Sequence, residues 1–315
     1  MNSGSLQNPQ GDSSATELGR FIPQHYHYQM LLDEARMLGF RTALELVVPV
    51  GGRVLELGTG TGVLSFFAAR SGAEKVWCVE RQPDLAERAR QLLAANGVDD
   101  RVEVVTGDAF EYLPPEPVDV VVCEMLHSAL LRESQVRMLA EFRARYTERF
   151  GPQLPVFVPQ ATLLGIEAIE FDFDFFDYRA PLPLFEDPSN PSNRLKTLGP
   201  VTPYKIVDYM NAPVESIAYQ GPLGIEIAGQ CKALRFVTKN ILAIDPDAAQ
   251  NSEAPGAGSP RGEHGIVEWM NQNLIVPLPE ALNVAAGQAL SVGFAYQPGD
   301  EIEVLLSTLT VASTD

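Results

Sequence analysis

A glycine-rich turn and two acidic side chains follow three successive strand-like runs of the sequence. The turn is Gly58-Thr59-Gly60-Thr61-Gly62, and the acids are Glu80 and Asp108. The carboxyl ends of parallel strands meet at the edge where open α/β sheets bind ligands, so we expect these three features to share one site. Glycines let the backbone approach a ligand closely, and the N–H groups of a following helix attract a negative group.

The residue types at this site suit a ligand that contains adenosine. Glu80 can accept hydrogen bonds from both hydroxyls of a ribose, and Asp108 can accept one from an adenine amino group. Val63 stands where the dinucleotide fingerprint GxGxxG has its third glycine, which disfavours NAD. Each acid alone would also fit a helix cap or a turn, but their joint position at consecutive strand ends favours a cofactor site.

Two further glutamates, Glu124 and Glu133, flank a short segment after the next strand-like run. Two carboxylates that converge can bind the planar fork of N–H donors on a guanidinium. An arginine guanidinium is effectively always protonated, so a reaction at one of its nitrogens requires the positive charge to be localised on the others. Paired carboxylates supply that localisation and also orient the attacking nitrogen. The pair therefore predicts chemistry on a cationic substrate.

Alternating strand and helix patterns surround these residues. Apolar runs predict strands at Arg53–Leu57, Lys75–Val79, Val102–Val105 and Val118–Cys123, and helical spacing predicts helices at Gln29–Val48, Val63–Arg70, Asp84–Ala95 and Glu133–Phe150. Right-handed crossovers between such elements give a parallel sheet covered on both faces. The sequence thus predicts an α/β fold that begins with a doubly wound, Rossmann-like domain.

The character of the sequence changes after Pro152. Short β-type runs broken by Pro, Gly and Asn predict strands at Ala161–Ile169, Gly224–Ile227, Leu234–Thr238, Gln288–Ala295 and Glu301–Leu306. We expect a disordered tail at 1–19, a Rossmann-like domain with N-terminal helices at 20–155, and a mostly β domain at 156–315. The stretch 245–265, rich in Ala, Pro, Ser and Gly, is expected to be a flexible surface loop.

The charge of the chain limits its partners. Its 315 residues include 41 acidic and 23 basic side chains, a formal net charge of −18, which argues against a nucleic acid or an anionic membrane as the main partner. An acidic surface favours a cationic substrate, and it equally serves solubility. The three cysteines lie far apart without zinc-type spacing, so we expect buried thiols and no metal site. Because we find neither a membrane-spanning apolar stretch nor a signal peptide pattern, we expect a cytoplasmic protein.

Taken together, these residues resemble the protein arginine methyltransferase family of class I S-adenosylmethionine-dependent methyltransferases. The resemblance includes the motifs Val54–Gly62 and Val79-Glu80 and the double-glutamate segment from Glu124 to Glu133. The segment His27–Arg36 is similar to the family's cofactor-covering helix. Phe157–Leu163 looks like the crossing into its β-barrel, and Val267-Glu268-Trp269 looks like its Thr-His-Trp segment.

The resemblance implies S-adenosyl-L-methionine as the cofactor and gives roles to individual residues. Arg36 would pair with the cofactor carboxylate, Met30 would lie beside the transferred methyl group, and Glu80 would bind the ribose. Gly58, Thr59, Gly60, Gly62 and Asp108 would complete the cofactor site. Glu124 and Glu133 would bind a substrate guanidinium, with Glu268 and Trp269 at the substrate site. A β-barrel-like substrate domain and a homodimer formed through an arm at about 178–197 are also implied.

Four departures from the family bear on the substrate. Met125 replaces a tryptophan, Ser128 a tyrosine, Gln135 a methionine and Glu268 a histidine. A third carboxylate at Glu268 would change the charge and the pKa values of the site. Three hypotheses follow: N-methylation of arginine in a protein or peptide, methylation of a small guanidine, amine or natural product, and cofactor binding without turnover in a regulatory protein. The intact pair of glutamates favours the first two, and the degree of methylation of the product is left open.

Overall fold

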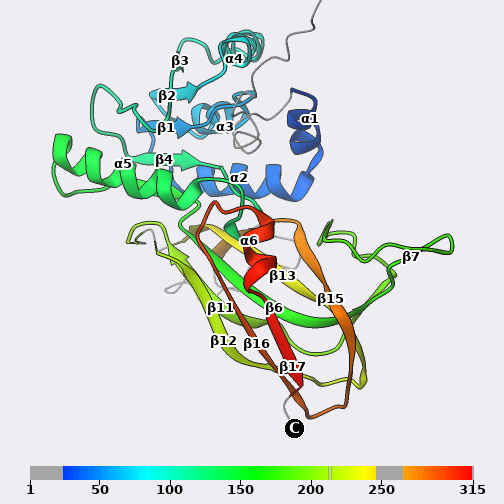
Figure 1. Ribbon diagram of the computed structural model, residues 1–315. Coiled ribbons are helices and arrows are strands. Elements are labelled where there is room, and N and C mark those ends of the chain that lie inside the picture. Colours follow the sequence, from blue (N-terminus) through cyan, green and yellow to red (C-terminus); the bar gives the residue numbers. More distant parts are fainter. Residues whose placement is uncertain (1–23, 212, 214, 246–264, 314–315) are drawn as a thin grey trace, which may run out of the picture.

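The computed structural model describes residues 24–211, 213, 215–245 and 265–313. An α/β layer built from the first half of the chain lies above a β-rich layer built from the second half (Figure 1). The predicted tail at 1–19 and nearly all of the predicted loop at 245–265 lie outside the described residues.

Five parallel strands form the sheet of the first domain. They are β1 (Arg53–Leu57), β2 (Lys75–Glu80), β3 (Val102–Thr106), β4 (Val120–Cys123) and β5 (Val156–Val158), in the order β3-β2-β1-β4-β5. β1, β2 and β4 are almost wholly buried, as expected of strands that are covered on both faces. The winding reverses between β1 and β4, and the crevice at such a switch point is where these sheets bind ligands. The predicted Rossmann-like fold is confirmed.

Two boundaries differ from the prediction. β5 pairs with β4, so the second domain begins a few residues later than the predicted residue 156. The single helix predicted at Gln29–Val48 is two helices, α1 (Gln24–Leu32) and α2 (Glu34–Val47). Asp33 separates them, because its carboxylate accepts a 2.9 Å hydrogen bond from the N–H of Arg36 and caps α2. The remaining helices of this domain are α3 (Val63–Arg70), α4 (Pro83–Ala95) and α5 (Gln135–Phe150), close to their predicted bounds.

Antiparallel strands form the second domain. They are β6 (Ala161–Phe171), β7 (Asp174–Phe175), β8 (Tyr178–Arg179), β9 (Leu184–Glu186), β10 (Leu195–Thr197), β11 (Thr202–Asp208), β12 (Ile217–Gly224), β13 (Gly229–Ile244), β14 (Ile266–Met270), β15 (Asn273–Val284), β16 (Ala289–Tyr296) and β17 (Thr310–Ser313). The larger sheet has the order β10-β6-β13-β15-β9, with β11 also on β6 and β14 also on β13. A smaller sheet has the order β12-β16-β17, and β7 pairs with β8 alone.

Two of the predicted strands in this domain are wrong. Glu301–Leu306 is largely helical, within α6 (Ile302–Thr308), because a helix of about two turns is too short for its period to stand out from the alternating pattern. In Gly224–Ile227 only Gly224 belongs to a strand, β12.

A continuous hydrophobic cluster passes from the first domain into the second. It includes Val121 of β4 and Leu139 of α5 together with Ile166 of β6 and Leu234 of β13. The two domains therefore share a core, and loops at their junction are held from both sides. In the described part of the chain, no helix combines the length and the apolar character needed to cross a membrane.

Candidate functional site

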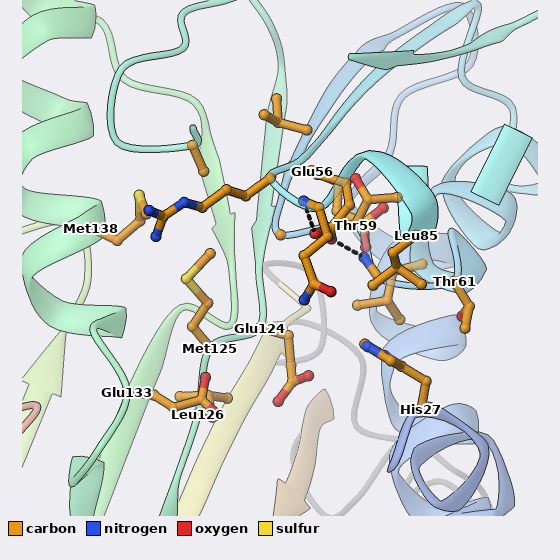
Figure 2. Close-up of a pocket in the computed structure, with 18 of the residues that line it drawn as sticks. His27, Glu56, Thr59, Thr61, Leu85, Glu124, Met125, Leu126, Glu133 and Met138 are labelled. Atoms are coloured by element: carbon orange, nitrogen blue, oxygen red, sulfur yellow. Dashed lines mark hydrogen bonds between the residues drawn. The ribbon is translucent and has the colours of Figure 1, made fainter. Parts of the chain in front are cut away.

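A pocket opens at the carboxyl edge of the parallel sheet and has a volume of about 360 Å³. Helix α1 contributes His27, Met30 and Leu31 to its wall. The predicted site residues that line it are Met30, Arg36, Gly58, Thr59, Gly60, Glu80, Asp108, Glu124 and Glu133. Figure 2 shows Glu124 and Glu133 at one end of the pocket, away from Thr59 and Leu85. The structure thus brings most of the predicted cofactor residues and both predicted catalytic glutamates into one cavity.

The glycine turn is held by Glu80. One carboxylate oxygen of Glu80 accepts a 2.9 Å hydrogen bond from the N–H of Gly60, and the other accepts one of 2.9 Å from the N–H of Gln82. Gly60 has a φ of 56°, and a Cβ atom there would lie 3.0 Å from Cε1 of His27. A carboxylate has about four acceptor positions. Glu80 can therefore shape the turn and still accept from the hydroxyls of a ribose.

Two other predicted residues lie at the margins of this turn. Gly62 does not line the pocket; it precedes α3, and a Cβ atom there would meet Leu93. Asp108 lines the pocket, and one of its oxygens accepts a 2.9 Å hydrogen bond from the N–H of Phe110. The role of Asp108 toward an adenine group stays a prediction.

Glu56, on β1, holds the start of the helix that follows the glycine turn. It is 2% exposed, and it accepts hydrogen bonds from the backbone N–H and the hydroxyl of Ser65 in α3. Burial raises the pKa of Glu56 to about 8, although the bonds from Ser65 oppose the rise. This residue therefore fixes the helix that follows the glycine turn to β1.

Arg36 is buried beside the two glutamates. Its guanidinium donates a hydrogen bond to Glu124 and another, of 3.3 Å, to the carbonyl oxygen of Met30. The guanidinium carbon also lies 5.9 Å from the ring centres of both Phe40 and Trp269. The predicted contact was with the cofactor carboxylate, and the observed one is with Glu124. A guanidinium carries five N–H donors, so one contact leaves room for the other.

Glu133 differs from Glu124 in its surroundings. Burial raises the pKa of both carboxyls, and the guanidinium of Arg36 opposes the rise at Glu124. The pKa of Glu133 rises to about 8, first through burial and then through the nearby Glu124. Arg36 and Arg132 oppose the rise at Glu133, but only Glu124 is hydrogen-bonded to Arg36.

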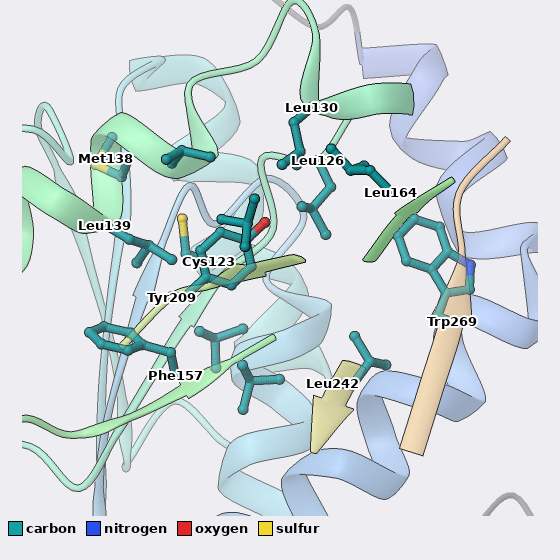
Figure 3. Packing of buried hydrophobic residues seen from close by; sticks show 14 of the residues in the cluster. Cys123, Leu126, Leu130, Met138, Leu139, Phe157, Leu164, Tyr209, Leu242 and Trp269 are labelled. Atoms are coloured by element: carbon teal, nitrogen blue, oxygen red, sulfur yellow. The ribbon is translucent and has the colours of Figure 1, made fainter. Parts of the chain in front are cut away.

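Glu268 does not line the pocket, and its role as a substrate-binding residue stays a prediction. Alternate residues of a strand face opposite sides, and β14 buries Val267 and Trp269 while it exposes Glu268. The Glu268 carboxylate is 2.9 Å from the ammonium of Lys239 on β13. Trp269 does not line the pocket either, but its ring contacts Arg36 from within the buried cluster between the domains (Figure 3).

Sequence reasoning missed two residues of the site. His27 lines the pocket, and its buried Nε2 has no hydrogen-bond partner among the described residues. Burial lowers the pKa of His27, which favours the neutral ring. The signal available was its position three residues before Met30, on the same helix face.

Gln135 is the second residue. Its side-chain oxygen accepts a 2.9 Å hydrogen bond from the N–H of Met125, and its side-chain nitrogen donates one of 2.7 Å to the carbonyl oxygen of Cys123. It is 1% exposed. Gln135 therefore ties the residues on both sides of Glu124 to the helix that follows Glu133. Its departure from the family's methionine was the available signal.

Comparisons with known proteins agree with this geometry. A family model described as a methyltransferase domain matches residues 54–148. An uncharacterised protein of Methanothermobacter thermautotrophicus is 30% identical over 261 residues, which cover 83% of this chain and 89% of that protein. The arginine N(omega)-methyltransferase of Streptomyces achromogenes subsp. streptozoticus is 36% identical over 149 residues, which cover 46% of this chain and only 41% of that enzyme.

The likeness to solved structures extends through both domains. One similar structure is the Trypanosoma brucei PRMT1 enzyme-prozyme heterotetrameric complex with AdoHcy. The match covers 86% of this chain and 87% of the chain in that structure, with a TM-score of 0.65 and 19% sequence identity. Such a likeness shows the shared fold. Together with the methyltransferase domain matched at residues 54–148, these comparisons support a class I S-adenosylmethionine-dependent methyltransferase that is similar to the protein arginine methyltransferases.

Proposed function

We propose that this enzyme transfers a methyl group from S-adenosylmethionine to a guanidino nitrogen of arginine in a protein or peptide. The observation that carries the proposal is that Glu124 and Glu133 line the same cavity as the glycine turn and Glu80. Two carboxylates in reach of one cation suit the planar guanidinium better than they suit a single ammonium.

Different residues of the pocket bind the cofactor and the substrate. The cofactor supplies a methyl group on a positively charged sulfur. Glu80 and the turn at Gly60 hold its nucleoside, and Met30 borders the cavity. Glu124 and Glu133 draw the positive charge of the guanidinium onto two nitrogens and leave the third to attack. As the new N–C bond forms, the bond between sulfur and the methyl carbon would break, and S-adenosylhomocysteine would be the leaving group. The attacking nitrogen loses a proton, and Glu133, with its pKa raised to about 8, is a suitable acceptor.

The test is transfer of labelled methyl from S-adenosylmethionine to parallel panels of arginine-rich proteins, short arginine peptides, free guanidino compounds and simple amines. Label on a guanidino nitrogen of the proteins or peptides is expected, and it should vanish in Glu133→Gln. Label on amines alone, or undiminished transfer by Glu133→Gln, would overturn the proposal.

A second candidate is methylation of a small guanidino compound. It is favoured by the loss of the family's two aromatic residues at Met125 and Ser128, and by the likeness to an arginine N(omega)-methyltransferase. The free guanidino compounds in the same panel decide between the two. The regulatory hypothesis rests on Glu268 together with the altered loop, and the presence of both Glu124 and Glu133 in the pocket speaks against it.

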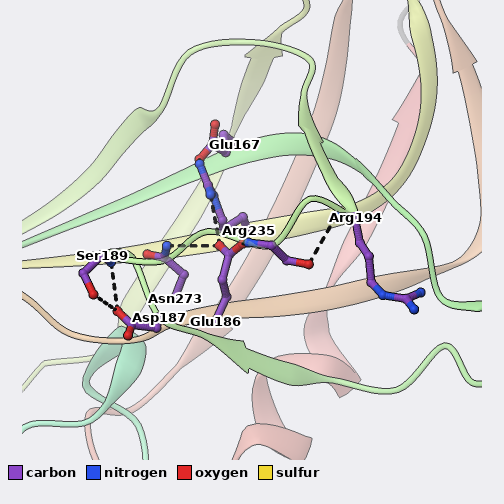
Figure 4. Close-up of polar contacts among 8 residues, drawn as sticks. Glu167, Glu186, Asp187, Ser189, Arg194, Arg235 and Asn273 are labelled. Atoms are coloured by element: carbon purple, nitrogen blue, oxygen red, sulfur yellow. Dashed lines mark hydrogen bonds and ion pairs between the residues drawn. The ribbon is translucent and has the colours of Figure 1, made fainter. Parts of the chain in front are cut away.

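We further propose that two copies of the chain associate through the hairpin β7–β8, which projects from the side of the second domain (Figure 1). Phe176 at its tip is 100% exposed, and Tyr178 is 73% exposed. In the larger sheet, β6 precedes the hairpin in the chain and β9 follows it. Arg235 of β13 bridges the buried carboxylates of Glu167 on β6 and Glu186 on β9 at 2.6 Å and 3.1 Å (Figure 4).

The predicted arm at about 178–197 is thus only partly an arm. Its later strands, β9 and β10, lie in the larger sheet, where they pair with β15 and β6. Light scattering should give twice the chain mass for the wild type and the single mass for Phe176→Asp. A single mass for both would rule the association out.

A further inference from the structure

The segment between the two glutamates has an unusual backbone. Ala129, Leu130 and Arg132 have φ values of 57°, 57° and 63°. This left-handed region is costly for any residue with a Cβ atom, and it persists only where the surroundings impose it. The residues that impose it should therefore control where Glu133, the next residue after Arg132, is placed.

Each of these left-handed residues is held by the second domain. The N–H of Ala129 donates to the hydroxyl of Thr238 on β13 at 2.7 Å, and the hydroxyl of Tyr296 on β16 donates to the carbonyl oxygen of Ala129 at 2.8 Å. The turn after β16 supplies the other two contacts, each of 2.8 Å: Gly299 N–H to the carbonyl oxygen of Leu130, and Arg132 N–H to the carbonyl oxygen of Asp300.

Of these contacts, the two to Ala129 should fix the backbone most strongly, because they are buried away from water. Ala129 and Thr238 are fully buried, and Tyr296 is 3% exposed. The hydroxyl of Tyr204 lies 3.0 Å from that of Tyr296 and completes its hydrogen bonding. In such surroundings a hydrogen bond is strengthened and an unpaired partner is costly.

From this geometry we propose that Tyr296 and Thr238 are positioning residues for methyl transfer. They do not touch the reacting atoms. Their hydroxyls hold Ala129 in the left-handed conformation that delivers Glu133 to the pocket opposite Glu124. The inference rests on the proposed role of this glutamate pair.

The first test compares two buried tyrosines that differ in what their hydroxyls contact. Tyr296→Phe removes the bond to Ala129, whereas Tyr209→Phe removes a 2.8 Å bond between that hydroxyl and Thr162 within the second domain. We expect kcat to fall by about fivefold or more in Tyr296→Phe, in line with one buried hydrogen bond lost in the transition state, and to stay near the wild-type value in Tyr209→Phe. The dissociation constant for S-adenosylhomocysteine should change in neither.

The second test is rescue. Glycine adopts positive φ without strain, so Ala129→Gly should return most of the lost kcat to Tyr296→Phe. Thr238→Val should behave like Tyr296→Phe, and Thr238→Ser, which keeps the hydroxyl, should behave like the wild type. A loss that Ala129→Gly fails to relieve, or equal losses in Tyr296→Phe and Tyr209→Phe, would overturn the proposal.

The substrate panel keeps the two proposals separate. If the wild type methylates a group other than a guanidino nitrogen, the proposed function fails, and the same variants are then compared on that substrate. If the wild type methylates guanidino nitrogens and the Tyr296 variants match it, the proposed function stands and the positioning role fails.

Discussion

Arg36 and Glu124 form an ion pair inside the pocket, although they are 88 positions apart in the chain. Burial raises the pKa of Glu124, and the main opposing effect is the positive charge of Arg36. The protein thus uses a cation of its own to oppose the rise in pKa that burial imposes on Glu124.

Replacing Arg36 with methionine should raise the pKa of Glu124 further. Less of the carboxylate would then be present at neutral pH, so kcat/KM at saturating cofactor should fall by about tenfold or more, and the acid limb of its pH profile should move to higher pH. Arg41→Met is the control, because Arg41 lies on the same helix and pairs with the exposed Glu45 at 2.9 Å. Arg36 also opposes the raised pKa of Glu133, so an acid limb that does not move in Arg36→Met would show that Arg36 sets the ionisation of neither carboxyl.

The pKa of Glu133, raised to about 8, has opposite consequences for activity and for stability. The ionised form binds a guanidinium, so kcat/KM should rise with pH up to about pH 8. A carboxyl whose pKa is higher in the folded than in the unfolded protein contributes stability below its unfolded pKa, and this contribution is lost as pH rises through the folded pKa. Glu133→Gln should therefore lose methyl transfer, yet its Tm should fall less than that of the wild type as pH rises from about 4.5 to about 8.

The control for that measurement is Glu148→Gln, at an exposed position of α5. Its Tm should follow that of the wild type at every pH. If Glu133→Gln and Glu148→Gln lose Tm in parallel, Glu133 does not titrate with a raised pKa.

Gly60 should be needed for cofactor binding more than for folding. Gly60→Ala would strain a position with φ of 56° and place a Cβ atom 3.0 Å from His27, so the dissociation constant for S-adenosylhomocysteine should rise by about tenfold or more. Gly97→Ala is the matched control, because φ there is 68° and no atom lies within 4 Å of the added Cβ. Calorimetry should find weaker binding in the first variant alone, although both lose about 1–2 kcal/mol of stability. If the two variants bind S-adenosylhomocysteine with equal affinity, the glycine turn is not part of the cofactor site.

Gln135→Met should disturb the placement of Glu124 and leave the cofactor site intact. The thioether keeps the volume but leaves the N–H of Met125 and the carbonyl of Cys123 without their partner, at a cost of about 1–3 kcal/mol in the free energy of unfolding. We expect kcat to fall by about tenfold, with little change in cofactor affinity. Asn240→Leu, which removes a buried amide that accepts a 2.7 Å bond from Thr162, should lose stability without losing kcat. If the two variants lose kcat equally, the effect of Gln135 is on folding alone.

The parts of the fold that were predictable are those whose signals are local. The strands from Arg53 to Cys123 lie in an alternating pattern with helices, and each element shows its own apolar period over enough residues to be recognised. α6 was predicted as a strand because its seven residues are too few to show a helical period. Within the site, the residues at strand ends were found because sheet topology alone brings them together.

What could not be predicted depends on pairings between distant segments. Glu268 faces Lys239 because of the register between β13 and β14, which includes a shift between Ile241 and Ala243. Nothing near Glu268 in the sequence fixes which face of the strand it occupies. The partners of Arg36 and of Ala129 are likewise set by tertiary packing.

The contacts that shape Ala129 join positions 109 and 167 residues apart, and this separation has a consequence for synthesis. As the chain leaves the ribosome, the residues that line the pocket are made well before Tyr296, while the core that the two domains share still lacks its later strands. The left-handed loop is complete only once β16 has been made and seated. A chain that ends before β16 would therefore lack the contact from Tyr296 to Ala129, and Glu133 would not be placed for methyl transfer.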